Sequence, residues 1–271
     1  MKPVTVLKRL GMSLLPTIVG RIERRILVTV RVRPDVAARL IPAPLQPRIV
    51  DGWSIAGVCL IRLGQMRPKG APRWLGLTSE NAAHRFAVQW LENGRIRDGV
   101  YIPDRDTDTR LNEVVGGRLF PGIHHRAKFE VWESEGRWRI GYERTGRSVK
   151  TVARNIAGWP PGSVFSSLAE ASEFYGGGCV GWSDAASDDG LDGVELSCDR
   201  WEMEPLLVER FESSYFQDRN LFPVGSVEFD SACLMRDIEH EWRTCGFLEP
   251  KVNDVNERAV PNLIPARDYH G

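Results

Sequence analysis

The chain reads Arg25-Ile26-Leu27-Val28-Thr29-Val30-Arg31-Val32 in its first strongly patterned segment. Apolar and polar residues alternate there, and most of the apolar ones are β-branched, which predicts a strand. Pro34–Leu40 follows as a short helix, because a proline lies at its start and Val36 and Leu40 are four residues apart. The prolines after Ile41 end this helix.

Strand patterns dominate the rest of the chain. Residues 54–63 carry apolar side chains at odd and even positions, which predicts a strand buried on both faces. Further strands are expected at 84–91, 100–102, 127–132 and 138–142, and a strand pair at 194–201 and 204–211. A helix is expected at 166–174, closed by the glycines at 176–178. Many short strands with few helices predict an antiparallel, β-rich α+β fold.

We expect three segments along the chain. Residues 1–24 combine basic and apolar side chains, which indicates an amphipathic lead-in that docks on the domain, with a membrane-surface helix as the alternative. Residues 25–249 form the folded domain. Residues 250–271 are largely polar and contain two prolines, which indicates a loosely held tail.

The composition narrows the function classes. The 271 residues include 36 basic and 36 acidic ones, so the basic surface expected of a nucleic-acid-binding protein is absent. The five cysteines are scattered and odd in number, which favours free thiols in the cytoplasm over disulfides or a zinc site. No apolar run reaches the roughly 20 residues that a transmembrane helix needs.

One stretch combines residues typical of turns with histidines, which can transfer protons near neutral pH. Residues 116–125 read Gly-Gly-Arg-Leu-Phe-Pro-Gly-Ile-His-His, which places three glycines and a proline beside two histidines. The order Gly117-Arg118-x-x-x-Gly122-x-x-His125 resembles the acetoacetate decarboxylase motif Gly-Arg-Glu-x-x-Gly-x-Pro-Lys.

Three other stretches are similar to a YqjF-like bacterial family within the acetoacetate-decarboxylase-like superfamily. They are residues 31–44, residues 80–88 with Gly99-Val100-Tyr101, and residues 230–236. The resemblance covers about residues 25–245. It implies a β-rich double sheet or cone barrel with an active site in its cavity. In the decarboxylase, the motif lysine forms a Schiff base with a β-keto acid, and a second lysine lowers its pKa.

The departures from the motif exclude that mechanism. His125 occupies the lysine position, Arg126 follows it, and Leu119 replaces the motif glutamate. An imidazole forms no iminium with a ketone, so a Schiff-base decarboxylase is not expected. Lys128 is the nearest lysine, and strand alternation places it on the face opposite to His125.

The remaining groups suit proton transfer. Arg126 favours the neutral form of His125, which is then a general base. Glu80 resembles in position a glutamate of the decarboxylase cavity, and a raised pKa would make it the complementary acid. Arg118 or Arg85 would hold a substrate carboxylate. Arg126 and Tyr101 complete the expected substrate-binding set. The first hypothesis is therefore a lyase- or isomerase-type enzyme acting on an oxygenated or keto-acid-like small molecule without a Schiff base.

Alternatives stay open for each residue. His125 as a hydrogen-bonded core histidine, Arg118 as a scaffold for loop carbonyls, Glu80 in a salt bridge and Arg85 on a solvated face are the structural interpretations. The second hypothesis is accordingly a non-catalytic protein that binds a small molecule in the retained cavity. The nine tryptophans and possible strand edges leave a homo-oligomer open.

No cofactor and no metal are expected. The candidate ligands are His84, His124, His125, Glu80, Asp104 and Asp106. Neighbouring histidines of a strand point to opposite faces, and no His-x-His or His-Glu-x-x-His spacing occurs. The acidic run 104–108 is expected to be a solvated loop.

Overall fold

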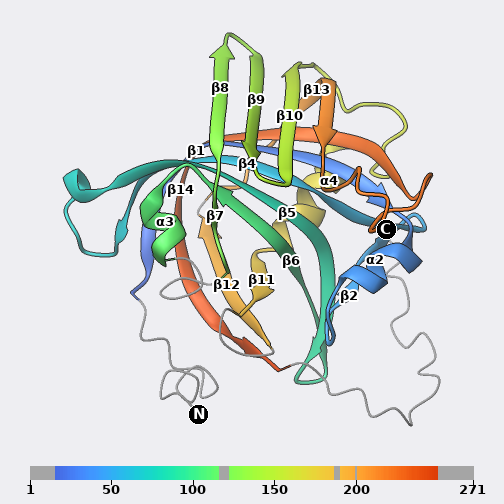
Figure 1. Cartoon of the computed structure of the whole chain (residues 1–271), viewed down its shortest axis with the longest axis horizontal. Coiled ribbons are helices and arrows are strands. Elements are labelled where there is room, and N and C mark those ends of the chain that lie inside the picture. The colour runs from blue at the N-terminus through green and yellow to red at the C-terminus, as the bar shows by residue number, and fades with distance from the viewer. Residues whose placement is uncertain (1–15, 116–121, 186–189, 199, 250–271) are drawn as a thin grey trace.

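The computed structural model describes residues 16–115, 122–185, 190–198 and 200–249. Seven strands close into a barrel, because the order β1-β4-β5-β6-β11-β12-β14 is completed by pairing of β14 with β1 (Figure 1). Their bounds are β1 Ile18–Val32, β4 Trp53–Pro68, β5 Leu77–Glu92, β6 Arg95–Thr107, β11 Val180–Asp184, β12 Leu191–Cys198 and β14 Val227–Leu248. The ring is antiparallel except where β6 runs parallel to β11.

A second layer continues from β14 and covers the outside of β1, β4, β5 and β6. Its strands are β13 Glu204–Ser213, β10 Arg147–Asn155, β9 Arg137–Arg144 and β8 Lys128–Ser134, in that order. Three two-residue strands flank the large ones: β2 Gln46–Pro47 beside β5, β3 Ile49–Val50 beside β4, and β7 His125–Arg126 parallel to β6. The helices of the described chain are α2 Pro34–Leu40, α3 Arg110–Val115, α4 Leu168–Gly176 and the short 3₁₀ helix η1 Arg73–Leu75.

Side chains alternate between two cores along the shared strands. On the outer face of the barrel, Ile26, Val58 and Phe86 pack against Trp138 and Ile140 of the second layer. On the inner face, a smaller cluster is built from Ile22, Leu27, Cys59, Ile61, Cys233 and Met235. The helix α4 packs its Ala171 and Phe174 against Ile55 and Ala87 of the inner face. Within each regular stretch of β1, β4 and β5, neighbouring residues thus face different cores, and the register shift between Ile22 and Arg24 changes the parity in β1.

The predicted β-rich α+β class with few helices is confirmed, and so is the strand at 54–63 that is buried on both faces. The helix at 34–40 has the predicted bounds. The second helix begins two residues later than predicted, because Ser167 caps it by accepting a hydrogen bond from the Glu170 amide.

Two expectations about local structure are wrong. The segments 194–201 and 204–211 do not pair with each other, since β12 and β13 each pair with β14. The run 104–108 is not a solvated loop, because Asp104 and Asp106 lie in β6 and are buried. The predicted antiparallel pairing holds for the large strands except between β6 and β11, and β6 is also parallel to the two-residue strand β7.

The first strand reaches back to Ile18, into the predicted lead-in. The predicted tail, 250–271, lies outside the described residues. No helix within the described ranges is long and apolar enough to cross a membrane.

Candidate functional site

Neighbouring polar residues on two strands point to opposite faces of the barrel wall. On β1, Arg24 pairs with Glu80 on the outer face, whereas Arg25 lines a cavity on the inner face. On β5, His84 packs against Tyr215 of the outer core, whereas Arg85 lines the same inner cavity as Arg25. This alternation creates two separate polar sites, which we call the barrel cavity and the outer polar cluster.

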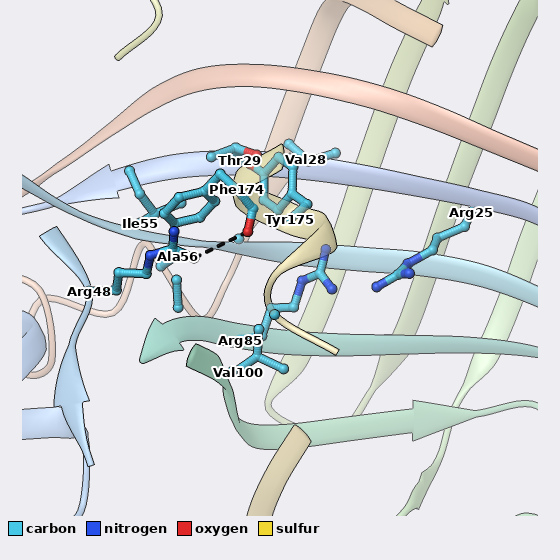
Figure 2. Close-up of a pocket in the computed structure, with 14 residues that line it drawn as sticks. Arg25, Val28, Thr29, Arg48, Ile55, Ala56, Arg85, Val100, Phe174 and Tyr175 are labelled. Atoms are coloured by element: carbon cyan, nitrogen blue, oxygen red, sulfur yellow. Dashed lines mark hydrogen bonds between the residues drawn. The ribbon is translucent and has the colours of Figure 1, made fainter. Parts of the chain in front are cut away.

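The barrel cavity lies between the inner faces of β1, β4, β5 and β6 and the C-terminal end of α4 (Figure 2). Its volume is about 30 Å³, which is room for roughly two water molecules. The polar side chains of its wall are Arg25, Arg48, Arg85, Thr29 and Tyr175. No carboxylate belongs to the wall as far as the described residues define it.

Among the described residues, Arg25 and Arg85 have no polar partner, whereas Arg48 has one. Arg25 is 9% exposed, and its Nε and Nη1 atoms form no hydrogen bond with any described residue. Its guanidinium lies over the Trp201 ring, 5.6 Å from the centroid. Arg85 likewise forms no hydrogen bond or ion pair within the described part of the chain. Figure 2 shows the two guanidinium groups directed toward each other.

Arg48 is compensated. Its Nη1 atom donates to the Phe174 carbonyl at 3.2 Å and lies 3.5 Å from a carboxylate oxygen of Asp98. Phe174 lies in the last turn of α4, where the helix dipole favours a cation. Its ring also lies 4.0 Å from the Arg48 guanidinium carbon. The uncompensated charge of the cavity therefore belongs to Arg25 and Arg85.

Two acids that act on Arg85, Cys233 and Tyr175, do not supply a counter-charge at neutral pH. Burial raises the pKa of Cys233 to about 12, and burial also raises the pKa of Tyr175. The Tyr175 hydroxyl is hydrogen-bonded to the Thr29 hydroxyl. Burial, and then the neighbouring charge of Arg25, lowers the pKa of Arg85. A lowered arginine pKa is the expected sign of a cation without a neutralising partner.

Arg105 and His124 extend the basic character of the inner face. The Arg105 guanidinium donates to the Ser183 hydroxyl, and burial lowers its pKa to about 10. Burial and then Arg105 lower the pKa of His124 to about 3, so this imidazole is neutral at pH 7. Gly122 allows the approach, because its φ is +84° and a Cβ there would lie 2.6 Å from Arg105 Nε. Gly122 therefore leaves room for the Arg105 side chain.

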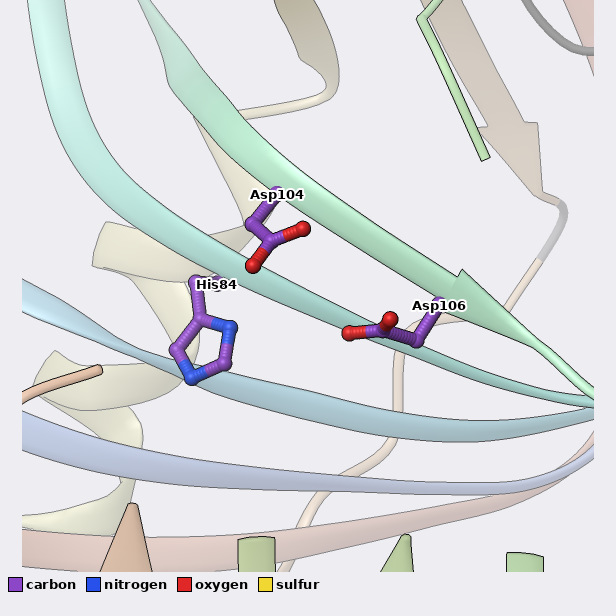
Figure 3. A group of neighbouring side chains, drawn as sticks. All are labelled: His84, Asp104 and Asp106. Carbon is purple, nitrogen blue, oxygen red and sulfur yellow. The ribbon is translucent and has the colours of Figure 1, made fainter. Parts of the chain in front are cut away.

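The outer polar cluster is centred on His84, Asp104 and Asp106 (Figure 3). One ligand atom from each lies within 4.8 Å of the others. Arg144 bridges the two aspartates, with its Nη2 atom 2.6 Å from Asp104 and its Nε bonded to Asp106. Arg147 adds a bond of 2.9 Å to Asp104. These four charged groups balance one another.

A metal ion has little to bind in this cluster. The guanidinium groups of Arg144 and Arg147 already occupy the Asp104 carboxylate. His84 uses Nε2 in a 3.0 Å hydrogen bond with Ser213, and its buried Nδ1 has no partner among the described residues. Burial lowers the pKa of His84 to about 3, so it is neutral at pH 7. A cation would have to displace the bridging Arg144, which the charge balance opposes.

His125 belongs to the outer polar cluster and not to the barrel cavity. Its Nε2 atom is 3.9 Å from Asp104 Oδ1, and 47% of its side chain is exposed. The register places it beside Asp106 of β6. His125 is therefore neither a core histidine nor a neighbour of Arg85.

Glu80 is 8% exposed and lies on the outer face with His84, four residues away on β5. Its carboxylate is 2.5 Å from Arg24 Nη2 and 3.6 Å from Arg62 Nη1. Burial raises its pKa, and Arg24 opposes that shift. The structure thus combines the two interpretations of Glu80, a salt bridge and a carboxyl with a raised pKa.

The other sequence candidates are dispersed. Arg126 is exposed and lines an open depression with Arg144 and Asp108. Tyr101 is 5% exposed in the outer core and donates to Asp184 at 3.1 Å. Arg118 lies outside the described residues. Of the expected residues that the structure describes, Arg85 alone lines the barrel cavity.

Sequence reasoning missed Arg25, Arg48 and Tyr175 as cavity residues. A signal existed for Arg25, because strand alternation places it on the face opposite to Arg24. Which of the two faces is hollow depends on α4 and on closure of the barrel, and neither is visible in the local pattern of residues 25–32.

Comparison of the sequence with protein-family models and with curated proteins finds no match. Solved structures do match in fold. An acetoacetate decarboxylase-like enzyme from Sphingomonas wittichii aligns with a TM-score of 0.53 at 15% identity, over 86% of this chain and 92% of that chain. The enduracididine biosynthesis enzyme MppR, complexed with pyruvate, aligns with a TM-score of 0.57 at 12% identity, over 86% of this chain and 89% of that chain. Acetoacetate decarboxylase from Legionella pneumophila aligns with a TM-score of 0.54 at 11% identity, over 87% of this chain and 88% of that chain. At these identities the likeness concerns the fold, and the chain has the fold of the acetoacetate-decarboxylase-like proteins.

Proposed function

We propose that this protein binds a small carboxylic acid of the keto-acid type in the barrel cavity, through Arg25 and Arg85. The observation that carries the proposal is a pair of guanidinium groups, of Arg25 and Arg85, that face one cavity and have no polar partner among the described residues. Buried charges are normally paired, because removal of an ion from water costs several kcal/mol. A ligand carboxylate supplies the missing partner.

The chemistry of the wall suits such a ligand. A guanidinium binds a carboxylate through two parallel N–H···O bonds, and these charge-assisted bonds are short and strong. Tyr175 and Thr29 add hydroxyl groups for a keto oxygen. Pyruvate is the molecule bound in the MppR structure. The shared fold makes pyruvate a sensible first ligand to test here.

A Schiff base is not part of the proposal. The lysines within the described ranges are Lys69, Lys128 and Lys150, and all three are exposed. Lys128 has a side chain that is 81% exposed and pairs with Glu130. A Schiff-base lysine works from a desolvated position that lowers its pKa, and none of these positions offers one.

Acid/base catalysis is the second candidate function, favoured by the proximity of His125 and Asp104. The aspartate would orient the imidazole, and half of the His125 side chain is open to solvent and to a substrate. Glu80, whose pKa is raised by burial, would be the acid. Arg126 in the neighbouring depression would hold the substrate carboxylate.

We also propose a cytoplasmic location, a division of the chain into three segments and membership of the YqjF-like family. The five cysteines are free, which supports a cytoplasmic location. The division into a lead-in, a single domain and a tail, and membership of the YqjF-like family, rest on the sequence patterns.

The binding proposal is tested by isothermal titration of the full chain with pyruvate and with pyruvamide, its uncharged analogue. Pyruvate is expected to bind, and pyruvamide to bind at least about tenfold more weakly, because it lacks the charge that the arginines need. Equal binding of the two compounds, or no binding of pyruvate, would contradict the proposal.

The catalytic candidate has its own assay. NMR in D₂O follows exchange of the pyruvate methyl protons in the presence of the protein. Exchange that is lost in His125→Ala, with an unchanged circular dichroism spectrum, would support catalysis by His125. Treatment with borohydride in the presence of acetoacetate is expected to leave the protein mass unchanged. A stable adduct would reveal a reactive lysine and overturn the exclusion of a Schiff base.

A further inference from the structure

We infer that the ligand of the barrel cavity is a compact dianion, with two negative charges on one small group or on adjacent carbon atoms. This inference rests on the proposed function and specifies the charge and size of the ligand. A monocarboxylate such as pyruvate would then bind as a weak analogue of the true ligand.

The charge count is the first argument. Arg25 and Arg85 both face the cavity, and neither has a carboxylate oxygen within 4.0 Å among the described residues. Arg48 does not add to this count, because Asp98 and the Phe174 carbonyl compensate it. Two unbalanced cations match an anion of charge −2.

The barrel wall itself is the second argument. Three acidic side chains of the barrel wall, Glu80, Asp104 and Asp106, lie on the outer face, where arginines pair with them. Arg105 adds a further inward guanidinium whose hydrogen bonds go to the neutral Ser183 hydroxyl. Around the cavity, Asp98 is engaged by Arg48, whereas Arg25, Arg85 and Arg105 have no carboxylate partner among the described residues.

The size of the cavity is the third argument. A volume of about 30 Å³ admits a group of a few heavy atoms and not an extended chain. The two guanidinium groups point toward each other across this space, so both charges of the ligand must lie close together (Figure 2). The positive charges of Arg25 and Arg85 also repel each other, and that repulsion is relieved when a dianion binds between them.

Oxalate and oxamate provide a matched test, because they have nearly the same shape and differ by one charge. Isothermal titration of the full chain, at low ionic strength and pH 7, is expected to show oxalate binding about 10- to 100-fold more tightly than oxamate. Arg85→Met is expected to abolish most of that preference. Arg210→Met is the control, since Arg210 is exposed and pairs with Glu212 on the surface.

The outcomes separate the two proposals. Equal affinity for oxalate and oxamate, with both weakened by Arg85→Met, would overturn the dianion inference and leave carboxylate binding intact. Failure of both compounds and of pyruvate to bind would overturn the proposed function itself. Should Arg85→Met fold poorly, Arg25→Met takes its place, and the comparison of oxalate with oxamate on the wild-type protein still decides the question.

Discussion

Arg24 and Arg25 are adjacent in β1, yet Arg24 binds the buried carboxylate of Glu80 on one face while Arg25 faces an arginine-lined cavity on the other. The first guanidinium has a partner and the second has none among the described residues. This contrast makes the two positions a matched pair for mutagenesis.

Replacement of the two arginines is expected to have different effects on stability. Arg24→Met leaves Glu80 buried without its closest cation, which is expected to lower the free energy of unfolding by about 3–5 kcal/mol. Arg25→Met removes an unpaired buried cation, so in ligand-free protein the unfolding free energy is expected to be unchanged or higher by up to about 2 kcal/mol. Urea denaturation measures both. Equal destabilisation by the two variants would show that Arg25 has a partner in the folded protein.

Asp104 is expected to stabilise the fold through the outer polar cluster. It is 7% exposed and accepts hydrogen bonds from Arg144 and Arg147. Asp104→Asn removes the charge that both arginines need, which is expected to cost about 3 kcal/mol of unfolding free energy. Asp35→Asn is the control, because its ion pairs are on the surface and are expected to contribute less than about 1 kcal/mol. A similar small loss for both variants would mean that the cluster contributes little.

The buried His84 predicts a loss of stability in acid. Burial lowers its pKa from 6.5 to about 3, so between these values the unfolded chain binds a proton that the folded chain does not. The contribution of the neutral, buried His84 to the free energy of unfolding is fully present above pH 6.5 and is lost as the pH falls toward 3. His84→Gln is expected to reduce the slope of unfolding free energy against pH near pH 5 by about 1.4 kcal/mol per pH unit.

His124 and His240 shift in the same direction, so the difference between wild type and variant is the quantity to measure. Urea midpoints recorded from pH 4.5 to 7 provide it. An unchanged slope in His84→Gln would show that His84 is protonated in the folded protein.

Gly57 is expected to tolerate no side chain. A Cβ at this position would lie 2.1 Å from the Val28 carbonyl oxygen of the paired strand β1. Gly57→Ala is therefore expected to cost about 3 kcal/mol, since the clash involves backbone that cannot move away. Gly158→Ala has open space around its Cβ and is expected to stay within about 0.5 kcal/mol of wild type. Thermal or urea denaturation that fails to distinguish them would refute the close pairing of β1 with β4.

The local sequence pattern was sufficient to predict those elements whose structure depends on residues that are neighbours in sequence. The alternation at 25–32 identified β1, and Pro34 with the spacing of Val36 and Leu40 identified α2. Ser167 begins α4 because it is a good N-cap residue, two positions beyond the predicted start.

Long-range pairing was not visible in the same way. β14 runs from Val227 to Leu248 and pairs with β1, β12 and β13. Its charged residues interrupt the apolar pattern, and its length follows from pairing with distant strands. The same cause misled the interpretation of residues 104–108. Asp104 and Asp106 are typical of a loop until Arg144, about 40 residues later, neutralises them inside the fold.

The candidate site shows the same limit. Arg85 was predicted as a carboxylate-binding residue, and it lines the barrel cavity. His125 and Glu80 were predicted to act with it, but strand parity places Glu80 on the other face and the register of β7 places His125 there as well. Parity could be worked out from sequence, whereas the position of the cavity required the closed barrel and α4.

The central claim is that the small acid binds in the barrel cavity, and one comparison tests it most directly. Pyruvate is titrated into Arg85→Met and into Arg126→Ala, which alter the cavity and the open depression respectively. The account predicts that Arg85→Met weakens binding about 10- to 100-fold and that Arg126→Ala leaves it unchanged. Loss of binding in Arg126→Ala with full binding in Arg85→Met would contradict it and place the ligand beside His125.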